Sequence, residues 1–160
     1  MYKRQIANGG YEIKPSLIHN SETKKKEKIL NKGVSINILP ILRKVVTTKE
    51  GTASLANIKG YEIGGKTGTA QKSLMGSYSE NKKINTFVSI FPTSKPKFVL
   101  AIMLDEPKIN KDYIYEYRDG SNFKLKGSPR NTAGWNSVEV SGHIIEKIGP
   151  ILATKYSEIN

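Results

Sequence analysis

The segment from Gly60 to Leu104 constrains the fold most strongly, because it predicts three successive strands with short connections between them. We expect these strands at residues 60–71, 84–91 and 97–104, from their apolar and β-branched content and the turn residues around them. The connection Pro92-Thr93-Ser94-Lys95-Pro96 is short enough to predict an antiparallel hairpin of the last two strands. The third strand is a nearly unbroken apolar run, which predicts burial on both faces and an inner position in the sheet.

Helices are predicted on both sides of these strands in the sequence. Residues 1–7 have the pattern of the end of a helix, and residues 37–48 form an amphipathic helix with Asn37 as its N-cap and Pro40 in its first turn. A last helix is expected at about 137–153, where apolar residues repeat at helical spacing. The order helix, three strands, helix predicts an α+β fold, in which an antiparallel β-sheet is flanked by helices.

The composition fits one globular domain and argues against several classes of protein. The chain has 160 residues, of which 37% are hydrophobic, and no apolar run long enough for a transmembrane helix or a signal peptide. It has no cysteine, which excludes disulfides and thiolate metal sites. The net charge of +12 suggests nucleic-acid binding, but 22 of the 26 basic residues are Lys. Phosphate recognition favours Arg, so a basic nucleic-acid-binding protein is the least favoured of the three functional hypotheses for this chain.

A Lys-Thr-Gly triad lies within the first predicted strand. It belongs to the run Gly65-Lys66-Thr67-Gly68-Thr69-Ala70-Gln71, which has small residues along one side of the strand. Such a triad on a strand is one of three signatures of serine acyl-transfer enzymes that recognise penicillin, together with Ser-x-x-Lys and Ser-x-Asn. This strand is therefore the part of the chain that points to a specific chemistry.

The other two signatures have only weak matches. Ser21-Glu22-Thr23-Lys24 fits Ser-x-x-Lys, but it lies in a polar, lysine-rich stretch without an apolar helix to bury it, and too close to Lys66. Ser35-Ile36-Asn37 fits Ser-x-Asn and is interpreted as a helix cap. We therefore expect the nucleophile-bearing part of such an enzyme to be absent from this chain.

A wider context identifies the family that the triad resembles. The thirteen residues Gly60–Lys72 and the stretch Val45–Ala53 closely resemble class B penicillin-binding proteins, most of all the division-associated peptidoglycan D,D-transpeptidases. The resemblance implies a partial β-lactamase/transpeptidase-like fold, with residues 1–160 as the C-terminal portion of the transpeptidase domain. Residues 107–133, which have no clear period, are expected to be a loop insertion. Flanking segments that agree with the resemblance are Ala7-Asn8-Gly9-Gly10, Phe91-Pro92 and Ala133-Gly134-Trp135-Asn136.

The resemblance also implies roles for four residues of the strand. The ammonium group of Lys66 faces the cleft, supports proton transfer and attracts the substrate carboxylate. The Thr67 hydroxyl binds that carboxylate at the end of the substrate. Gly68 keeps the strand bare, so that the substrate backbone can lie alongside it. Thr69 offers its backbone N–H to the oxyanion hole and its hydroxyl to the carboxylate.

The function implied by the resemblance is that of a fragment of a peptidoglycan D,D-transpeptidase, contributing the strand that binds substrate and penicillin during cell-wall cross-linking. It implies no cofactor and no metal, and it leaves open a role in cell division or in cell shape. The expected partners are stem peptides ending in D-Ala-D-Ala, β-lactams, the N-terminal part of the same transpeptidase and division proteins. The family works at the periplasmic face of the inner membrane, to which it is anchored, although this chain carries no targeting segment.

Alone, the chain is expected to be inactive, because acyl transfer needs a nucleophile and a base within hydrogen-bond reach. The main alternative is a non-catalytic remnant, or a partner-complementing module of a split gene. Two further groups of residues bear on other functions. His19 and His143 are isolated in the sequence, which argues against a metal site. An aromatic group is expected to cover the edge of the core rather than to bind a partner; its members are Tyr113, Tyr115, Tyr117, Phe123 and Trp135.

Overall fold

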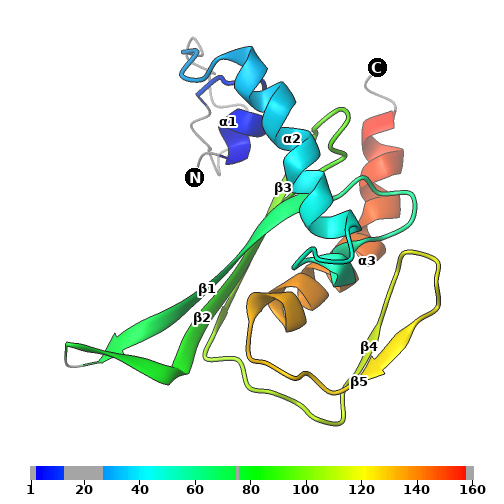
Figure 1. Ribbon diagram of the computed structural model, residues 1–160. Helices are drawn as coiled ribbons and strands as arrows, with labels where there is room; N and C mark the ends of the chain where they lie inside the picture. Colours follow the sequence, from blue (N-terminus) through cyan, green and yellow to red (C-terminus); the bar gives the residue numbers. More distant parts are fainter. Residues whose placement is uncertain (1–2, 13–26, 75, 158–160) are drawn as a thin grey trace.

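The computed structural model describes residues 3–12, 27–74 and 76–157 (Figure 1). His19 and the match Ser21–Lys24 lie outside these ranges. The elements in chain order are α1 (Lys3–Ala7), α2 (Lys32–Thr47), the short 3-10 helix η1 (Ser54–Ala56), β1 (Gly64–Leu74), β2 (Ser77–Phe91), β3 (Phe98–Asp105), β4 (Ile114–Glu116), β5 (Lys124–Lys126), the short 3-10 helix η2 (Ala133–Trp135) and α3 (Ser137–Ser157).

The first three strands form one antiparallel sheet in the order β1-β2-β3, as predicted. Gly64 lies opposite Ile90 at one end of the first pair, and Phe91 lies opposite Phe98 at the start of the second. The strand β1 begins four residues later than predicted, and both β1 and β2 are longer at their shared turn than expected. In Figure 1 this far end of the β1–β2 hairpin projects from the body of the molecule. The α+β prediction is confirmed.

The predicted inner position of the third strand is wrong for the described chain. Of the sheet's three strands β2 is the central one, and β3 is at an edge. Side chains of β3 alternate between half-buried and exposed, and Met103 is 71% exposed. One face of β3 is half-buried, and the other exposes apolar side chains such as Val99 and Met103. Because both faces carry apolar residues, the sequence of β3 resembles that of a strand buried on both faces.

The core lies on one face of the sheet. Phe87 is fully buried there, and Val138 and Ile145 of α3 belong to the same buried cluster. Two neighbouring glycines mark the two faces. A Cβ at Gly64 would meet the backbone of α2, whereas a Cβ at Gly65 would meet the Phe87 ring. Since successive strand residues point to opposite faces, α2 and the Phe87 core lie on opposite sides of β1 here.

The helix α2 starts earlier than the sequence pattern predicted. Its N-cap is Asn31, whose side chain accepts a hydrogen bond from the Gly33 backbone N–H at 2.9 Å. Asn37 and Pro40 therefore lie inside the helix, and the interpretation of Ser35-Ile36-Asn37 as a helix cap is wrong. The helix tolerates Pro40 although a proline there removes an intrahelical donor.

The segment 107–133 is more structured than the predicted loop. It contains the antiparallel pair β4–β5, in which Tyr115 lies opposite Leu125. The aromatic group covers the core edge as predicted at Tyr115, which is buried, while Phe123 is exposed. Rings stack edge to face from Tyr113 to Tyr115 and on to Trp135, with centroids 4.8 and 5.1 Å apart.

The last helix, α3, continues through Pro150 to Ser157, beyond the predicted end at 153. Within the residues that the structure covers, no helix combines the length and apolar content needed to cross a bilayer.

Candidate functional site

The start of β1 is held in place by α2 and the core. The Arg43 guanidinium donates to the backbone oxygen of Ile63 at 2.7 Å and to the side-chain oxygen of Asn57 at 3.2 Å. At Gly65 a Cβ would come within 2.6 Å of the Phe87 ring, so only glycine allows this close packing. The strand that carries Lys-Thr-Gly is thus fixed from both faces just before the triad.

Lys66 is exposed on β1, and its Nζ donates to the backbone oxygen of Thr67 at 2.7 Å. Because side chains alternate along a strand, Lys66 and Thr67 leave β1 toward opposite faces. Lys3 of α1 lies close enough for its pKa to be lowered, first by burial and then by the positive charge of Lys66. The first helix therefore contributes to the electrostatic surroundings of Lys66.

The hydroxyls of Thr67 and Thr69 face a common cavity of about 380 Å³. The Thr67 hydroxyl is hydrogen-bonded to the Thr52 hydroxyl at 2.9 Å, and the Thr69 hydroxyl accepts from the Ala133 backbone N–H at 3.0 Å. These bonds join β1 to the loop after α2 and to the loop before α3. The lining residues are Gly51, Thr52, Ser54, Leu55, Thr67, Thr69, Tyr117, Arg130, Thr132, Ala133, Gly134 and Trp135.

Gly68 lies between the two threonines and points to the other face. A Cβ there would come 2.7 Å from the Thr86 hydroxyl, which donates to the Gly68 backbone oxygen at 3.3 Å. The glycines at 64, 65 and 68 are thus all approached closely by groups of the chain itself. Backbone and ring atoms of the chain account for the glycines at 64 and 65, whereas at 68 the only close group is the Thr86 hydroxyl.

Reasoning from the sequence missed the two loops that close the cavity. Thr52 and Ala133 both bond directly to the triad strand, and a Cβ at Gly134 would lie 2.7 Å from the Thr52 backbone oxygen. Both loops belong to segments that carried the family resemblance, but the residues themselves have no chemistry that singles them out. The available sequence signal was Gly134, which lies just before the helix expected at about 137–153.

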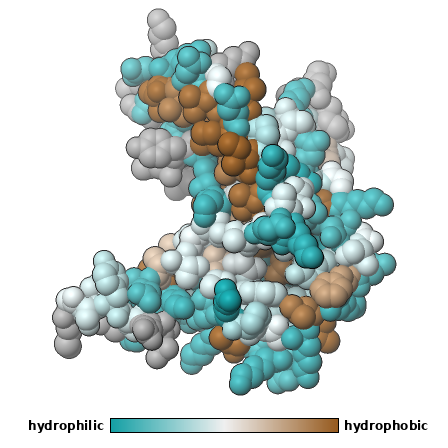
Figure 2. Space-filling model, viewed as in Figure 1, coloured by the Kyte–Doolittle hydropathy of each residue, from teal (hydrophilic) through white to brown (hydrophobic). Residues whose placement is uncertain are grey.

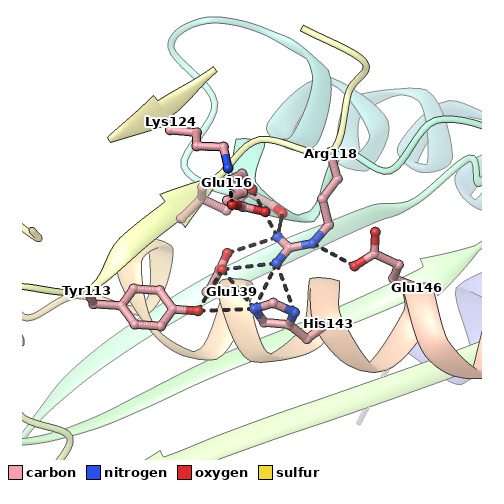
Figure 3. Close-up of polar contacts among 8 residues, drawn as sticks. Tyr113, Glu116, Arg118, Lys124, Glu139, His143 and Glu146 are labelled. Carbon is pink, nitrogen blue, oxygen red and sulfur yellow. Dashed lines mark hydrogen bonds and ion pairs between the residues drawn. The ribbon is translucent and has the colours of Figure 1, made fainter. Parts of the chain in front are cut away.

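A buried ion pair fixes the β4–β5 segment to α3 (Figure 3). Arg118 and Glu139, whose side chains are each 6% exposed, form two hydrogen bonds of 3.0 Å. The guanidinium also donates to the Leu55 backbone oxygen at 3.1 Å and to Glu146 at 3.2 Å. Because η1, α3 and the β4–β5 segment meet at Arg118, the pair holds the walls of the cavity together.

Tyr113 and His143 complete this cluster (Figure 3). The Tyr113 hydroxyl donates to Glu139 at 3.1 Å and lies 3.1 Å from Nε2 of His143. Burial and the Glu139 charge raise the pKa of Tyr113. Burial alone lowers the pKa of Arg118, but its bonds to Glu139 and Glu146 outweigh burial and raise it. The expectation that His143 is isolated is wrong, and its i,i+4 spacing from Glu139 was the missed signal.

The site offers carboxylate-binding groups but no assembled acyl-transfer pair. In the described part of the chain, Lys66 makes no hydrogen bond to a serine hydroxyl, and no group of His, Asp and Glu is arranged to hold a metal. The geometry provides two hydroxyls that line the cavity, and the outer edge of β1, which pairs with no other described strand. The Lys66 ammonium leaves β1 toward the opposite face and does not line the cavity. An unpaired strand edge can hydrogen-bond to an extended peptide.

An antiparallel sheet flanked by helices, with Lys-Thr-Gly on its outer strand, defines a β-lactamase-like domain of the type that recognises penicillin. The sequence profile of the penicillin binding protein transpeptidase domain matches residues 1–122, and the chain belongs to this family. The resemblance inferred from the sequence is thereby confirmed.

Relatives of the chain carry the name peptidoglycan D,D-transpeptidase. The chain is 29% identical over 160 residues to the probable peptidoglycan D,D-transpeptidase FtsI of Caulobacter vibrioides, with 94% of this chain and 25% of that protein covered. It is 36% identical over 101 residues to the FtsI homolog of Nephroselmis olivacea, covering 62% of this chain and 14% of that protein. The chain thus spans a quarter or less of these relatives.

Solved structures share the fold. The transpeptidase domain of penicillin-binding protein 3 from Burkholderia pseudomallei has a TM-score of 0.69 and 23% identity, over 96% of this chain and 40% of that one. Penicillin-binding protein 3 from Mycobacterium tuberculosis, solved in complex with aztreonam, has a TM-score of 0.68 and 24% identity, over 91% of this chain and 33% of that one.

Proposed function

We propose that this chain supplies the substrate-binding strand of a peptidoglycan D,D-transpeptidase. The observation that carries the proposal is the pair of hydroxyls of Thr67 and Thr69, which line one cavity beside the outer edge of β1. Two hydroxyls at i and i+2 on a strand lie about 7 Å apart along it, a spacing at which both can reach one bound carboxylate. The terminal carboxylate of a D-Ala-D-Ala peptide, or that of a β-lactam, fits this arrangement.

Each residue of the triad has a defined task in this proposal. Lys66 draws the carboxylate to the site and joins the proton-transfer network. Thr67 and Thr69 donate their hydroxyls to the carboxylate, and the backbone N–H of Thr69 is one donor of the oxyanion hole. In known oxyanion holes the loss of one donor costs about 3–4 kcal/mol of transition-state stabilisation. Gly68 keeps the outer surface of the strand open to the peptide.

The nucleophile in this proposal comes from the preceding part of the same transpeptidase domain. Two surfaces of the chain support such a partner. Figure 2 shows apolar side chains gathered over α2, where Ile41 is 60% exposed and Val34 and Ile36 are also exposed. The exposed row of β3 adds Val99 and Met103. Apolar surfaces and an unpaired strand edge are typical of regions that another part of a domain covers.

The exposed apolar residues of α2 and β3 also support the alternative, a partner-complementing module encoded by a split gene. A non-catalytic remnant would also lack a serine hydroxyl bonded to Lys66, as the described part of the chain does. The names of the FtsI relatives support a role in cell division. The family resemblance implies that the enzyme works at the periplasmic face of the inner membrane. Structural neighbours solved with aztreonam and with ampicillin support β-lactams as ligands of the complete site.

The carboxylate assignment is tested on the chain itself by nuclear magnetic resonance. The chain is titrated with N-acetyl-D-Ala-D-Ala and, as a matched probe, with the same dipeptide carrying a C-terminal amide. We expect saturable shifts of the Thr67 and Thr69 amide signals with the free acid only. Equal shifts with both probes, or shifts confined to other residues, would contradict the assignment.

A further inference from the structure

A second cavity adjoins the one beside Thr67 and Thr69. This second cavity, of about 560 Å³, shares Arg130 and Thr132 with the first. Its lining residues are Lys83, Glu106, Pro107, Lys108, Ile109, Pro129, Arg130, Asn131 and Thr132. The two adjoining cavities are called the groove below, and Arg130 lies where they adjoin.

The groove follows β1 away from Thr67. In the β1–β2 register, Thr69 lies opposite Asn85 and Gln71 lies opposite Lys83. Lys83 lines the second cavity, and the loop that carries Arg130 is bonded to Thr69 through Ala133. At about 3.3 Å per residue, Gln71 lies about 13 Å along the strand from Thr67. A peptide whose end is bound at Thr67 therefore reaches the second cavity within a few residues.

The charge of the second cavity is positive on balance. Among the residues that the structure covers, none pairs a carboxylate with Lys83, Lys108 or Arg130. The cavity's own carboxylate, Glu106, shares the Lys72 ammonium with Asp105, at 2.9 and 2.6 Å. Three cations against one partly neutralised carboxylate leave the cavity attractive to an anionic ligand.

The backbone that presents Arg130 is held by several hydrogen bonds. The Ser128 hydroxyl donates to the Arg130 backbone oxygen at 2.6 Å. The Asn131 amide donates to the Pro107 backbone oxygen at 2.5 Å and accepts from the Asn85 amide at 3.0 Å. Asn85 is fully buried in β2, so Asn131 anchors the loop to the sheet just after Arg130. Just before Arg130, Ser128 anchors the loop through the Arg130 backbone oxygen.

We infer that this groove binds a second carboxylate of the donor peptide, upstream of the terminal D-Ala-D-Ala, with Arg130 as the principal contact. The inference rests on the proposed function, because it uses the terminal carboxylate at Thr67 to set the direction of the peptide. A guanidinium can hold a carboxylate through two parallel hydrogen bonds, whereas Lys83 and Lys108 add attraction without fixed geometry. Arg130 is then a specificity-determining residue of the site.

Two matched peptides test the inference by isothermal titration calorimetry. The first is acetyl-D-γ-Glu-Nε-acetyl-L-Lys-D-Ala-D-Ala, and the second has the α-carboxylate of its glutamate replaced by a carboxamide. We expect the wild-type chain to bind the acid about tenfold more tightly than the amide, as for one charge-assisted bidentate contact. Arg130→Gln reduces this preference to about twofold or less. Lys97→Gln, a control of equal charge change at the opposite end of the sheet from Lys83, retains it.

The outcomes separate the inference from the function on which it rests. If wild type binds both peptides equally, or if Arg130→Gln keeps the full preference for the acid, the second-carboxylate site is wrong and the carboxylate site at Thr67 stands. If neither peptide binds, both proposals fail. A preference for the acid that Arg130→Gln removes, and that about 0.5 M salt reduces, supports the inference.

Discussion

At the residue scale, Gly65 and Gly68 look equivalent in the sequence but have different surroundings. A Cβ at Gly65 would press on the fully buried Phe87 ring and on the Val88 backbone oxygen, neither of which can yield easily. We therefore expect Gly65→Ala to destabilise the chain by about 1–3 kcal/mol, the usual cost of overpacking. The free energy of unfolding from urea titrations measures this cost.

Gly68→Ala is the matched comparison. Its new Cβ would meet only the Thr86 hydroxyl, which can rotate away, so its stability stays within about 1 kcal/mol of wild type. Peptide binding is the property that this variant loses, because the methyl group stands on the open surface of β1. A loss of stability as large as that of Gly65→Ala would mean that Gly68 serves packing alone.

Tyr113 adds a pH dependence to the stability. Its pKa is raised in the folded chain, by burial first and by Glu139 next, so folding favours the protonated phenol. That contribution is complete below the unfolded pKa of about 10 and is lost as the pH rises through the folded pKa. As the pH rises above about 10, the urea midpoint of wild type should fall more steeply than that of Tyr113→Phe. Parallel decreases in the two proteins would contradict the assignment.

At the scale of elements, the start of α2 provides a direct comparison of two asparagines. Asn31→Ala removes the hydrogen bond to the Gly33 N–H and should cost about 1 kcal/mol. Asn37→Ala, on an exposed position inside the helix, should gain about 0.5 kcal/mol because alanine has the higher helix propensity. If Asn37→Ala were the more harmful change, the helix would begin where the sequence pattern placed it.

The Arg118–Glu139 pair joins the β4–β5 segment to α3. Arg118→Leu leaves Glu139 buried without its partner, which should destabilise the chain by about 3–5 kcal/mol. Lys124→Gln breaks an ion pair whose side chains, Lys124 and Glu116, are 60% and 57% exposed, and it should cost less than about 1 kcal/mol. Thermal unfolding of both variants measures the contrast, and equal losses would mean that the buried pair has no special role.

The elements differ in how well the sequence predicted them. The second and third strands of the sheet were predictable because each has an apolar pattern and a short connection joins them. The first strand and its triad were visible because the Lys-Thr-Gly residues are contiguous. The start of α2 was missed because two asparagines each precede a plausible helix. The cavity walls were missed because Thr52, Arg130 and Ala133 meet β1 only through the fold, at separations that no local pattern records.

At the scale of the whole molecule, the exposed apolar residues of α2 and β3 predict association. We expect the purified chain to form larger species at high concentration, because an uncovered edge strand with apolar side chains pairs readily with another. Met103→Lys places a charge on that edge and should shift the chain toward the monomer in sedimentation velocity experiments. Lys97→Gln serves as the control outside the apolar row. Unchanged association of Met103→Lys would exclude β3 as the contact.

The central claim is that this chain carries the substrate strand of a penicillin-reactive transpeptidase whose nucleophile lies outside it. Labelling the source cells with fluorescent penicillin, and identifying the peptides in each labelled band by mass spectrometry, tests it most directly. We predict that peptides spanning Lys66 occur in a labelled band, together with the nucleophile-bearing part of the enzyme or in complex with it. Label attached covalently to this chain itself, or Lys66 peptides found in unlabelled material alone, would contradict the claim.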